Sequence, residues 1–517
     1  MRITNTMITS HTKTNINANK LLVDKYNTQM TTQKKIAKAS ENPVIAIRAL
    51  RLSTTMTHIT QYLDNNITDA DAWMDVTETA LTNIKALLTD VRTQCVNGST
   101  DTLTTEERES FLESLQSLSE QIYIEGNADY AGKSVFTGYR TSSTLTFDEK
   151  EANTKYQITQ NLTYKDIEGK RYYTGTVNVP EAVTDETPEC TTKIEENTYD
   201  RLRLAYNGNT ELQNVSYKLA DGTEVSLIST TKNEDGTTSV IQNENLKIYE
   251  TEDAWEADTS NKEIGKTIAP NEVVYIKQTG ELIFGSDIAN SLADGHADFT
   301  VEYTKQGFEK GEVRPEYYYD CVDITEEDPS KHIAYKKENQ DINYTIAANV
   351  QLTINTQISD VYDSAIARDV DEMISLLTKS NNAQAKVDEI KRMMSESRHS
   401  DEETQAKLQT YLDAAQKELD YSTDNLQRTY GNFITRFDGY LTKVNIAITN
   451  VGSMKNRLTM TQTRMETQKM TVEELQTSNE DREISDIIID YYAAYDAYQS
   501  SLTAAGKIEK TSLLDYL

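Results

Sequence analysis

The sequence is poor in the residues that support disulfide, zinc and membrane chemistry. Its three cysteines, Cys95, Cys190 and Cys321, are far apart and share no C-x-x-C spacing. This argues against a disulfide framework and a zinc knuckle. No run approaches the ~18 apolar residues of a membrane span. The N-terminus also lacks the apolar segment of a secretory signal, so we expect no cleavable signal peptide.

Basic and apolar residues are also scarce. The chain has 52 Lys and Arg against 83 Asp and Glu, a formal net charge of −31. Binding to nucleic acid or to an anionic membrane needs clustered positive charge, so neither is expected as a partner. The apolar fraction is 37%, below the ~45–50% of a typical compact domain. Long helices with narrow apolar stripes fit this deficit better than one large core.

Catalytic signatures are missing as well. No phosphate-binding G-x-x-x-x-G-K-[ST] loop and no G-x-S-x-G elbow occurs, and the five histidines include no H-E-x-x-H. Acidic pairs are too frequent in this chain to indicate a glycosidase site. We therefore predict no enzyme activity, no cofactor and no metal site.

Helix-breaking residues divide the chain into three parts. Five of the six prolines and eleven of the nineteen glycines lie between Tyr139 and Tyr344. Because proline and glycine interrupt helices, this predicts a turn-rich middle between two helical arms. The expected domains are an N-terminal helical arm (1–138), a β-rich insert (139–345) with one or two subdomains, and a C-terminal helical arm (346–517) that pairs with the first. The predicted fold class is α+β multidomain, with long terminal helices in a coiled-coil bundle.

The N-terminal arm carries a heptad pattern. Asn42 is a predicted N-cap and Pro43 a predicted first helical residue. From there one helix of about fifty residues is expected to reach Asn97. Its apolar seam follows alternating spacings of four and three. The seam residues are Met56, Thr60, Leu63, Ile67, Ala70, Met74, Thr77, Leu81, Ile84, Leu88, Val91 and Cys95.

The middle of the chain has the pattern of β-strands. Val273–Ile276 and Phe299–Tyr303 are rich in β-branched and aromatic residues, which favour half-buried pleated surfaces. Asn-Gly and Asp-Gly pairs between such runs indicate tight turns. An antiparallel sandwich or barrel is the default expectation.

The C-terminal arm has a second set of apolar seams. Both chain ends therefore present apolar stripes that nothing adjacent in sequence covers. We expect the two ends to pair with each other and then with neighbouring chains. The predicted assembly seam here comprises Val451, Leu458, Ile484, Ile488, Tyr491, Tyr495, Leu502, Leu513 and Leu514.

Four terminal motifs resemble one known family. Residues 40–44 read S-E-N-P-V, with Ser40, Asn42 and Pro43 at its signature positions, and residues 132–138 read G-K-S-V-F-T-G. Residues 451–458 read V-G-S-M-K-N-R-L, including Asn456 and Arg457, and residues 512–517 read S-L-L-D-Y-L. Together they resemble the flagellar hook-associated protein 3 family, which is flagellin-like. The resemblance covers about residues 1–147 and 346–517, whereas the middle matches no family.

The resemblance implies a structural function. Members are adaptors at the hook–filament junction, located outside the cell on the bacterial flagellum and exported unfolded by the flagellar type III apparatus. The implied partners are the first hook-associated protein, flagellin, further copies in a ring, and a cytoplasmic export chaperone that binds the C-terminal helices. Two alternatives stay open: a flagellin that repeats along the filament, or an adhesin displayed through the β insert.

Overall fold

The computed structural model describes residues 5–99, 105–181, 187–232, 238–258, 268–396 and 400–510. Long helices lie toward both chain ends and the strands lie between them, which confirms the α+β fold class. The chain forms two compact units. Unit 1 comprises Met1–Asp71, Asn343–Leu352 and Met454–Leu517, and unit 2 comprises Ala72–Ile342 and Thr353–Ser453. The domain boundaries expected from composition stay a prediction.

Helices account for most of the two arms. Among the described residues they are α1 (Asn5–Thr32), α2 (Pro43–Gln61), the π-helical segment η1 (Tyr62–Ile67), α3 (Thr68–Gly98), α4 (Thr105–Gly126), α5 (Glu252–Ala257), α6 (Ser286–Asp294), α7 (Ala365–Ser395), α8 (Glu402–Glu480) and α9 (Ile484–Lys510). None of the helices described is long and apolar enough to span a bilayer.

The start of α2 follows from two residues. The Asn42 side chain accepts hydrogen bonds from the backbone N–H groups of Val44 and Ile45, at 3.1 and 3.3 Å. Pro43 occupies the first helical position, where its missing N–H costs no hydrogen bond. The predicted N-cap is thereby confirmed.

The helix expected to run unbroken to Asn97 contains a π-helical segment, Tyr62–Ile67. Ile59 and Ile67 are both buried, although eight residues separate them. At 100° per residue, eight residues of α-helix overshoot two turns by about 80°. A π turn holds an additional residue, so it brings the two isoleucines back onto one face. The predicted seam residue Thr60 is only half-buried, and its neighbour Ile59 is buried instead.

Strands form two larger sheets in unit 2. The seven-stranded sheet has the order β14-β13-β3-β12-β6-β7-β8 and is antiparallel throughout. The five-stranded sheet has the order β4-β5-β11-β10-β9, and its β9–β10 pair is parallel. The strands of the larger sheet are β3 (Glu151–Thr163), β6 (Asn209–Lys218), β7 (Glu224–Lys232), β8 (Thr238–Gln242), β12 (Asp298–Phe308), β13 (Asp320–Asp323) and β14 (Ile333–Tyr335).

The smaller sheets complete the β structure. The five-stranded sheet comprises β4 (Ile167–Thr174), β5 (Glu195–Arg203), β9 (Leu246–Tyr249), β10 (Val273–Ile276) and β11 (Glu281–Phe284). Two hairpins pair β1 (Asp129–Tyr130) with β2 (Lys133–Ser134), and β15 (Asn343–Ala347) with β16 (Val350–Thr353). The predicted strands at Val273–Ile276 and Phe299–Tyr303 are confirmed. The all-antiparallel expectation is wrong, because β9 joins its sheet in parallel.

The helices of unit 2 pack around Tyr430 of α8. Its hydroxyl donates to the backbone oxygen of Met373 in α7 at 2.9 Å, and its ring stacks on Phe111 of α4. Gly98 is the last residue of α3, and its φ is not positive. A Cβ there would lie 2.3 Å from the Tyr430 ring. Close approach of this ring, rather than a left-handed cap, therefore requires the glycine.

Buried ion pairs fasten the five-stranded sheet to α7. Arg201 of β5 pairs with Glu281 of β11 at 2.5 Å and with Glu372 of α7 at 2.7 Å. Arg203 pairs with Glu372 at 3.0 Å and with Asp369. Burial alone would raise the pKa of Glu372, but Arg201 and its basic neighbours outweigh it and hold that pKa far below its usual range.

The same network reaches α8. The fully buried Asp369 accepts hydrogen bonds from Arg436 at 2.8 Å and from the Tyr440 hydroxyl at 2.7 Å. Arg436 also pairs with Glu168 of β4. Two helices and three strands of unit 2 therefore share one set of buried charges.

The cysteines are all free. Cys95 of α3 is buried, and its Sγ lies 3.7 Å from the Met373 Sδ of α7. Burial raises the pKa of this thiol to about 12. Cys95 therefore acts as a small apolar side chain in the core, as its place in the seam indicated.

Candidate assembly surface

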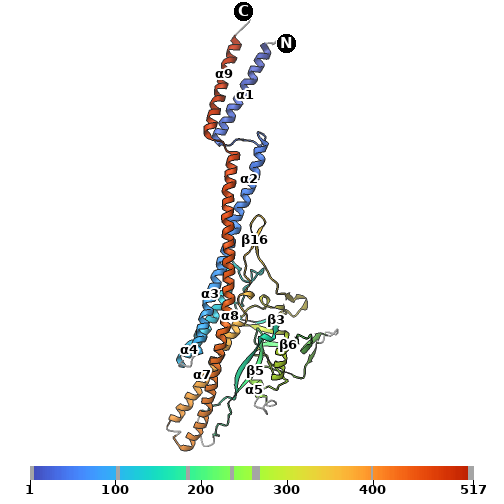
Figure 1. Cartoon of the computed structure of the whole chain (residues 1–517), viewed down its shortest axis with the longest axis vertical. Coiled ribbons are helices and arrows are strands. Elements are labelled where there is room, and N and C mark those ends of the chain that lie inside the picture. The colour runs from blue at the N-terminus through green and yellow to red at the C-terminus, as the bar shows by residue number, and fades with distance from the viewer. Residues whose placement is uncertain are drawn as a thin grey trace, which may run out of the picture. The chain divides into compact units, whose positions relative to one another are not determined.

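The two terminal helices of the described chain form an antiparallel pair in unit 1. α1 lies beside α9 (Figure 1). Asn19 of α1 donates to the Ser501 hydroxyl at 2.6 Å and to the Ala497 oxygen at 3.3 Å. The half-buried face of α1 repeats at spacings of four and three, the pattern of a coiled-coil seam. Its members are Thr12, Ile16, Asn19, Val23, Tyr26 and Met30.

This pair buries very little apolar surface. In α1 the only described residue that is fully buried is polar, Gln29. In α9 the buried side chains are Ile487 and Ala494. Each fully buried aliphatic side chain contributes about 1.5–3 kcal/mol, so this interface alone stabilises the pair weakly. Most of the stability of a helix in a protein comes from tertiary packing of its apolar face, and that packing is sparse here.

A second apolar strip of α9 faces solvent. It lies beside the face that contacts α1 and includes most of the seam predicted for this helix. We call it the outer strip. Its residues and exposed fractions are Ile484 (45%), Ile488 (37%), Tyr492 (61%), Tyr495 (39%) and Leu502 (44%).

Exposed apolar side chains are concentrated in unit 1. Of the twenty-two large hydrophobic side chains that are exposed among the described residues, sixteen belong to this unit. Unit 1 makes up less than a third of the sequence. Exposed apolar side chains concentrated in one part of a chain favour an interaction site there. Besides the outer strip, those of unit 1 are Met7, Ile8, Leu21, Leu22, Val44, Ile47, Leu50, Met460, Met470, Leu475 and Ile489.

A short joint links the terminal pair to the rest of unit 1. The segment after α1 runs antiparallel to the segment before α9. The N–H of Lys35 donates to the Glu480 oxygen at 2.6 Å, and the N–H of Arg482 donates to the Gln33 oxygen at 2.9 Å. Gln33 adopts a φ of 55°, a conformation that few residues other than glycine tolerate. These two backbone hydrogen bonds therefore hold the two segments side by side.

Charged side chains reinforce this joint. Lys34 pairs with Asp481 at 2.6 Å. Arg482 donates to the Gln29 amide oxygen at 3.2 Å and pairs with Asp490 of α9. The hydrogen bond to Asp490 raises the pKa of the Arg482 guanidinium. These contacts fix where α9 begins relative to α1.

The predicted seam residues fall into three groups. Those on the long helices are packed inside the chain: Ile67, Met74, Leu81, Ile84, Leu88, Val91, Val451 and Leu458 are buried, and Leu63 is half-buried. On α9, Tyr491 is half-buried, whereas Ile484, Ile488, Tyr495 and Leu502 are exposed. Leu513 and Leu514 lie outside the described residues.

The family-motif residues have local structural roles. Asn42 and Pro43 start α2, and Ser40 lies exposed in the turn before it. Arg457 of α8 donates to the Gln351 oxygen of the β15–β16 hairpin at 3.3 Å, and its neighbour Asn456 is exposed. No described contact shows any of them at a boundary between chains. Their role in assembly stays a prediction.

Sequence reasoning missed the residues that hold α9 to α1. Ile487, Ala494 and Ser501 face α1. The predicted seam residues Ile488, Tyr495 and Leu502 each come one position later in the sequence. The run Ile487-Ile488-Ile489 is apolar on every side. A heptad pattern cannot choose among such positions. The available signal was polar. Asn19 lies seven residues before Tyr26 on α1, and Ser501 lies seven residues after Ala494 on α9.

Known proteins match the N-terminal arm of the chain in sequence. Residues 3–141 match the model of the bacterial flagellin N-terminal helical region. Flagellar hook-associated protein 3 of Escherichia coli (strain K12) is 28% identical over 127 residues, which cover 24% of this chain. The match spans 40% of the length of that curated relative.

Solved structures give a weaker likeness. A protein of Vibrio parahaemolyticus assigned as a flagellar hook-associated protein is 12% identical, with coverage of 85% of this chain and 100% of its own, at a TM-score of 0.34. The flagellar junction protein FlgL of Legionella pneumophila is 10% identical, with coverage of 77% and 99%, at a TM-score of 0.21. The sequence matches nevertheless confirm the resemblance that the motifs indicated: the chain carries a flagellin-type N-terminal helical region, similar to that of flagellar hook-associated protein 3.

Proposed function

We propose that the chain is a structural adaptor at the hook–filament junction of the bacterial flagellum, with unit 1 as its assembly surface. The observation that carries this proposal is the exposed outer strip of α9, on a helix pair with almost no core of its own. A helix pair of this kind gains stability when a neighbouring subunit covers the strip. The match of residues 3–141 to the flagellin N-terminal region supports a flagellar setting.

The energetics support assembly of many copies. If a neighbour buries the five side chains of the outer strip, each contributes up to about 1.5–3 kcal/mol before the entropy of association is subtracted. The free subunit would keep α1 and α9 only loosely paired. Assembly would therefore order the termini, which suits a chain that must stay monomeric until it reaches its site.

The partners follow from the same proposal. Copies of the chain would form a ring, with the first hook-associated protein on one side and flagellin on the other. A cytoplasmic export chaperone would cover the C-terminal helices before type III export, and the assembled protein would lie outside the cell. The function is structural rather than enzymatic. The match to hook-associated protein 3, which extends over only part of each chain, supports these assignments.

Charge placed on the outer strip tests the proposal. In a strain that lacks this chain, we expect hooks to form while flagellin is shed as monomers. Full-length protein should restore filaments, whereas Leu502→Glu should not. Ala504→Glu provides the matched control, since Ala504 is exposed on the opposite flank of α9. Equal restoration by both variants, or normal filaments without the chain, would refute the proposal.

A filament subunit is the second candidate, because the family model that matches is that of flagellin. Copy number separates the two functions. Quantitative mass spectrometry of purified flagella would show one ring per filament for a junction protein. A copy number in proportion to filament length would instead identify a flagellin.

A further inference from the structure

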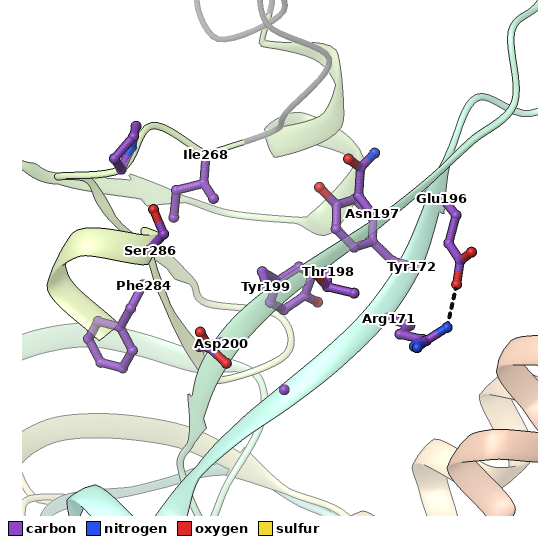
Figure 2. A pocket seen from close by; sticks show the side chains of 12 residues that line it. Arg171, Tyr172, Glu196, Asn197, Thr198, Tyr199, Asp200, Ile268, Phe284 and Ser286 are labelled. Atoms are coloured by element: carbon purple, nitrogen blue, oxygen red, sulfur yellow. Dashed lines mark hydrogen bonds and ion pairs between the residues drawn. The ribbon is translucent and has the colours of Figure 1, made fainter. Parts of the chain in front are cut away.

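A cleft of about 640 Å³ lies over the five-stranded sheet of unit 2. Figure 2 shows its two sides: Ile268 precedes β10 and Ser286 begins α6, whereas Thr198 and Asp200 belong to β5. This volume lies within the range of about 300–1,000 Å³ found for small-molecule sites. The proposed assembly function makes no use of this cleft.

The floor of the cleft is open because of one glycine. Gly169 of β4 pairs with Asp200 of β5, and Arg171 pairs with Thr198, so these four residues share one face of the sheet. Gly169 does not have a positive φ, and a Cβ there would contact only the Asp200 Oδ1, at 3.6 Å. Neither backbone conformation nor crowding therefore requires a glycine. A strand glycine of this kind often marks a place where a ligand approaches the backbone.

The charges in the cleft favour a neutral ligand. The Arg171 guanidinium is already compensated by two carboxylates, Glu196 at 2.9 Å and Asp424 of α8 at 3.9 Å, so it does not attract an anionic ligand. The Asp200 carboxylate has no hydrogen bond or ion pair to any described residue, and burial raises its pKa. An anion would be repelled by Asp200. For a metal ion, the described residues contain no cluster of three or more suitable ligands.

The remaining groups are hydrogen-bonding and apolar. Asp200 accepts hydrogen bonds, and the hydroxyls of Thr198 and Ser286 both donate and accept. The Tyr172 ring and the Ile268 side chain supply apolar surface at the rim, from the side of the β4–β5 pair opposite Gly169 and Asp200, where they pack against Tyr199. Sugars present several hydroxyl donors together with an apolar C–H face, and this combination matches the cleft. We propose that the cleft binds a neutral saccharide, with Asp200 accepting hydrogen bonds from its hydroxyl groups.

Saturation-transfer difference NMR on the full-length chain tests this proposal. The probes are galactose, mannose, N-acetylglucosamine and N-acetylgalactosamine, with N-acetylneuraminic acid as an anionic comparison. We expect saturation transfer to at least one neutral sugar. Gly169→Val, a strand-compatible change that fills the floor, should abolish it. Asp200→Asn should weaken binding about tenfold, because a charge-assisted hydrogen bond is replaced by a neutral one.

The controls separate lost binding from lost folding. Thr159→Val changes a threonine of β3 in the other large sheet and should leave binding unchanged. Circular dichroism melting reports whether each variant is folded; if Gly169→Val is not, Asp200→Asn decides. Absence of transfer to all four neutral sugars would overturn the proposal. Undiminished binding by a folded Gly169→Val or by Asp200→Asn, or stronger binding of N-acetylneuraminic acid than of any neutral sugar, would also overturn it.

Discussion

Deleting one residue from the π-helical segment Tyr62–Ile67 should be tolerated better than the same deletion one helical turn or more away. The perturbation is removal of Asp64, an exposed residue of η1. At present eight residues lead from Ile59 to Ile67, and the π turn accommodates the additional one. After the deletion seven residues lead from one isoleucine to the other.

The magnitude follows from helix geometry. Seven residues of regular α-helix turn about 700°, only about 20° short of two turns, so both isoleucines stay on the buried face without a π turn. Removal of the exposed Thr54 from α2 instead rotates everything before it by about 100° relative to Ile59. That rotation would expose the stripe that includes Leu52 and Ala49. A fully buried aliphatic side chain contributes about 1.5–3 kcal/mol, and Leu52 and Ala49 are half-buried, so we expect the Thr54 deletion to cost about 1–3 kcal/mol and the Asp64 deletion less.

Thermal unfolding followed by circular dichroism measures both deletions against the unmodified chain. We expect a lower midpoint for the Thr54 deletion and a nearly unchanged one for the Asp64 deletion. If the two midpoints fall equally, or the Asp64 deletion is the more damaging, the π turn does not serve to keep the stripe in register.

Three further predictions concern unit 2. Asp369→Asn removes the fully buried carboxylate that Arg203 and Arg436 share and leaves them only Glu372 and Glu168, so urea unfolding should show a loss of up to about 3–5 kcal/mol. Asp438→Asn, in its exposed pair with Arg92, should cost little or nothing; equal losses would contradict this. Because the pKa of Glu372 is lowered in the folded state, its stabilising contribution is complete above about pH 4.5 and is lost as the pH falls further. The free energy of unfolding, measured from pH 6 to pH 3, should therefore depend less steeply on pH in Glu372→Gln than in the unmodified chain. Gly98→Ala places a Cβ against the Tyr430 ring and should lower the stability of the fold by about 1–3 kcal/mol. Gly452→Ala is the control: no atom lies within 4 Å of its Cβ, so it should stabilise α8 by up to about 1 kcal/mol. Stabilisation by both variants in thermal melts would argue against crowding at Gly98.

Local rules explain what could be predicted from the sequence. The start of α2 needed only Asn42 and Pro43, because a cap is satisfied by residues within one turn. The buried stripe of α3 followed from spacing, since a regular helix with one apolar face leaves little choice. The strands at Val273–Ile276 and Phe299–Tyr303 were similarly marked by their own composition.

What could not be predicted depends on residues far apart in the chain. The face of α9 that contacts α1 is chosen by a partner some 480 residues away, and α9 is apolar on more than one face. The π turn was hidden because Thr60 satisfies a regular spacing as well as Ile59 does. The pairing of Arg203 with Asp369 joins positions 166 residues apart, in a chain where acidic residues are too abundant to identify partners.

The joint between the terminal helices and the rest of unit 1 has a mechanical consequence. A single-stranded linker lets the segment beyond it swivel, because rotation about backbone bonds is cheap. Here two antiparallel segments are connected by the Lys35–Glu480 and Arg482–Gln33 hydrogen bonds. Twisting the α1–α9 pair would require these bonds to break together. Such a double connection resists torsion while it still permits bending, so the terminal helix pair can pass on a torque applied to it.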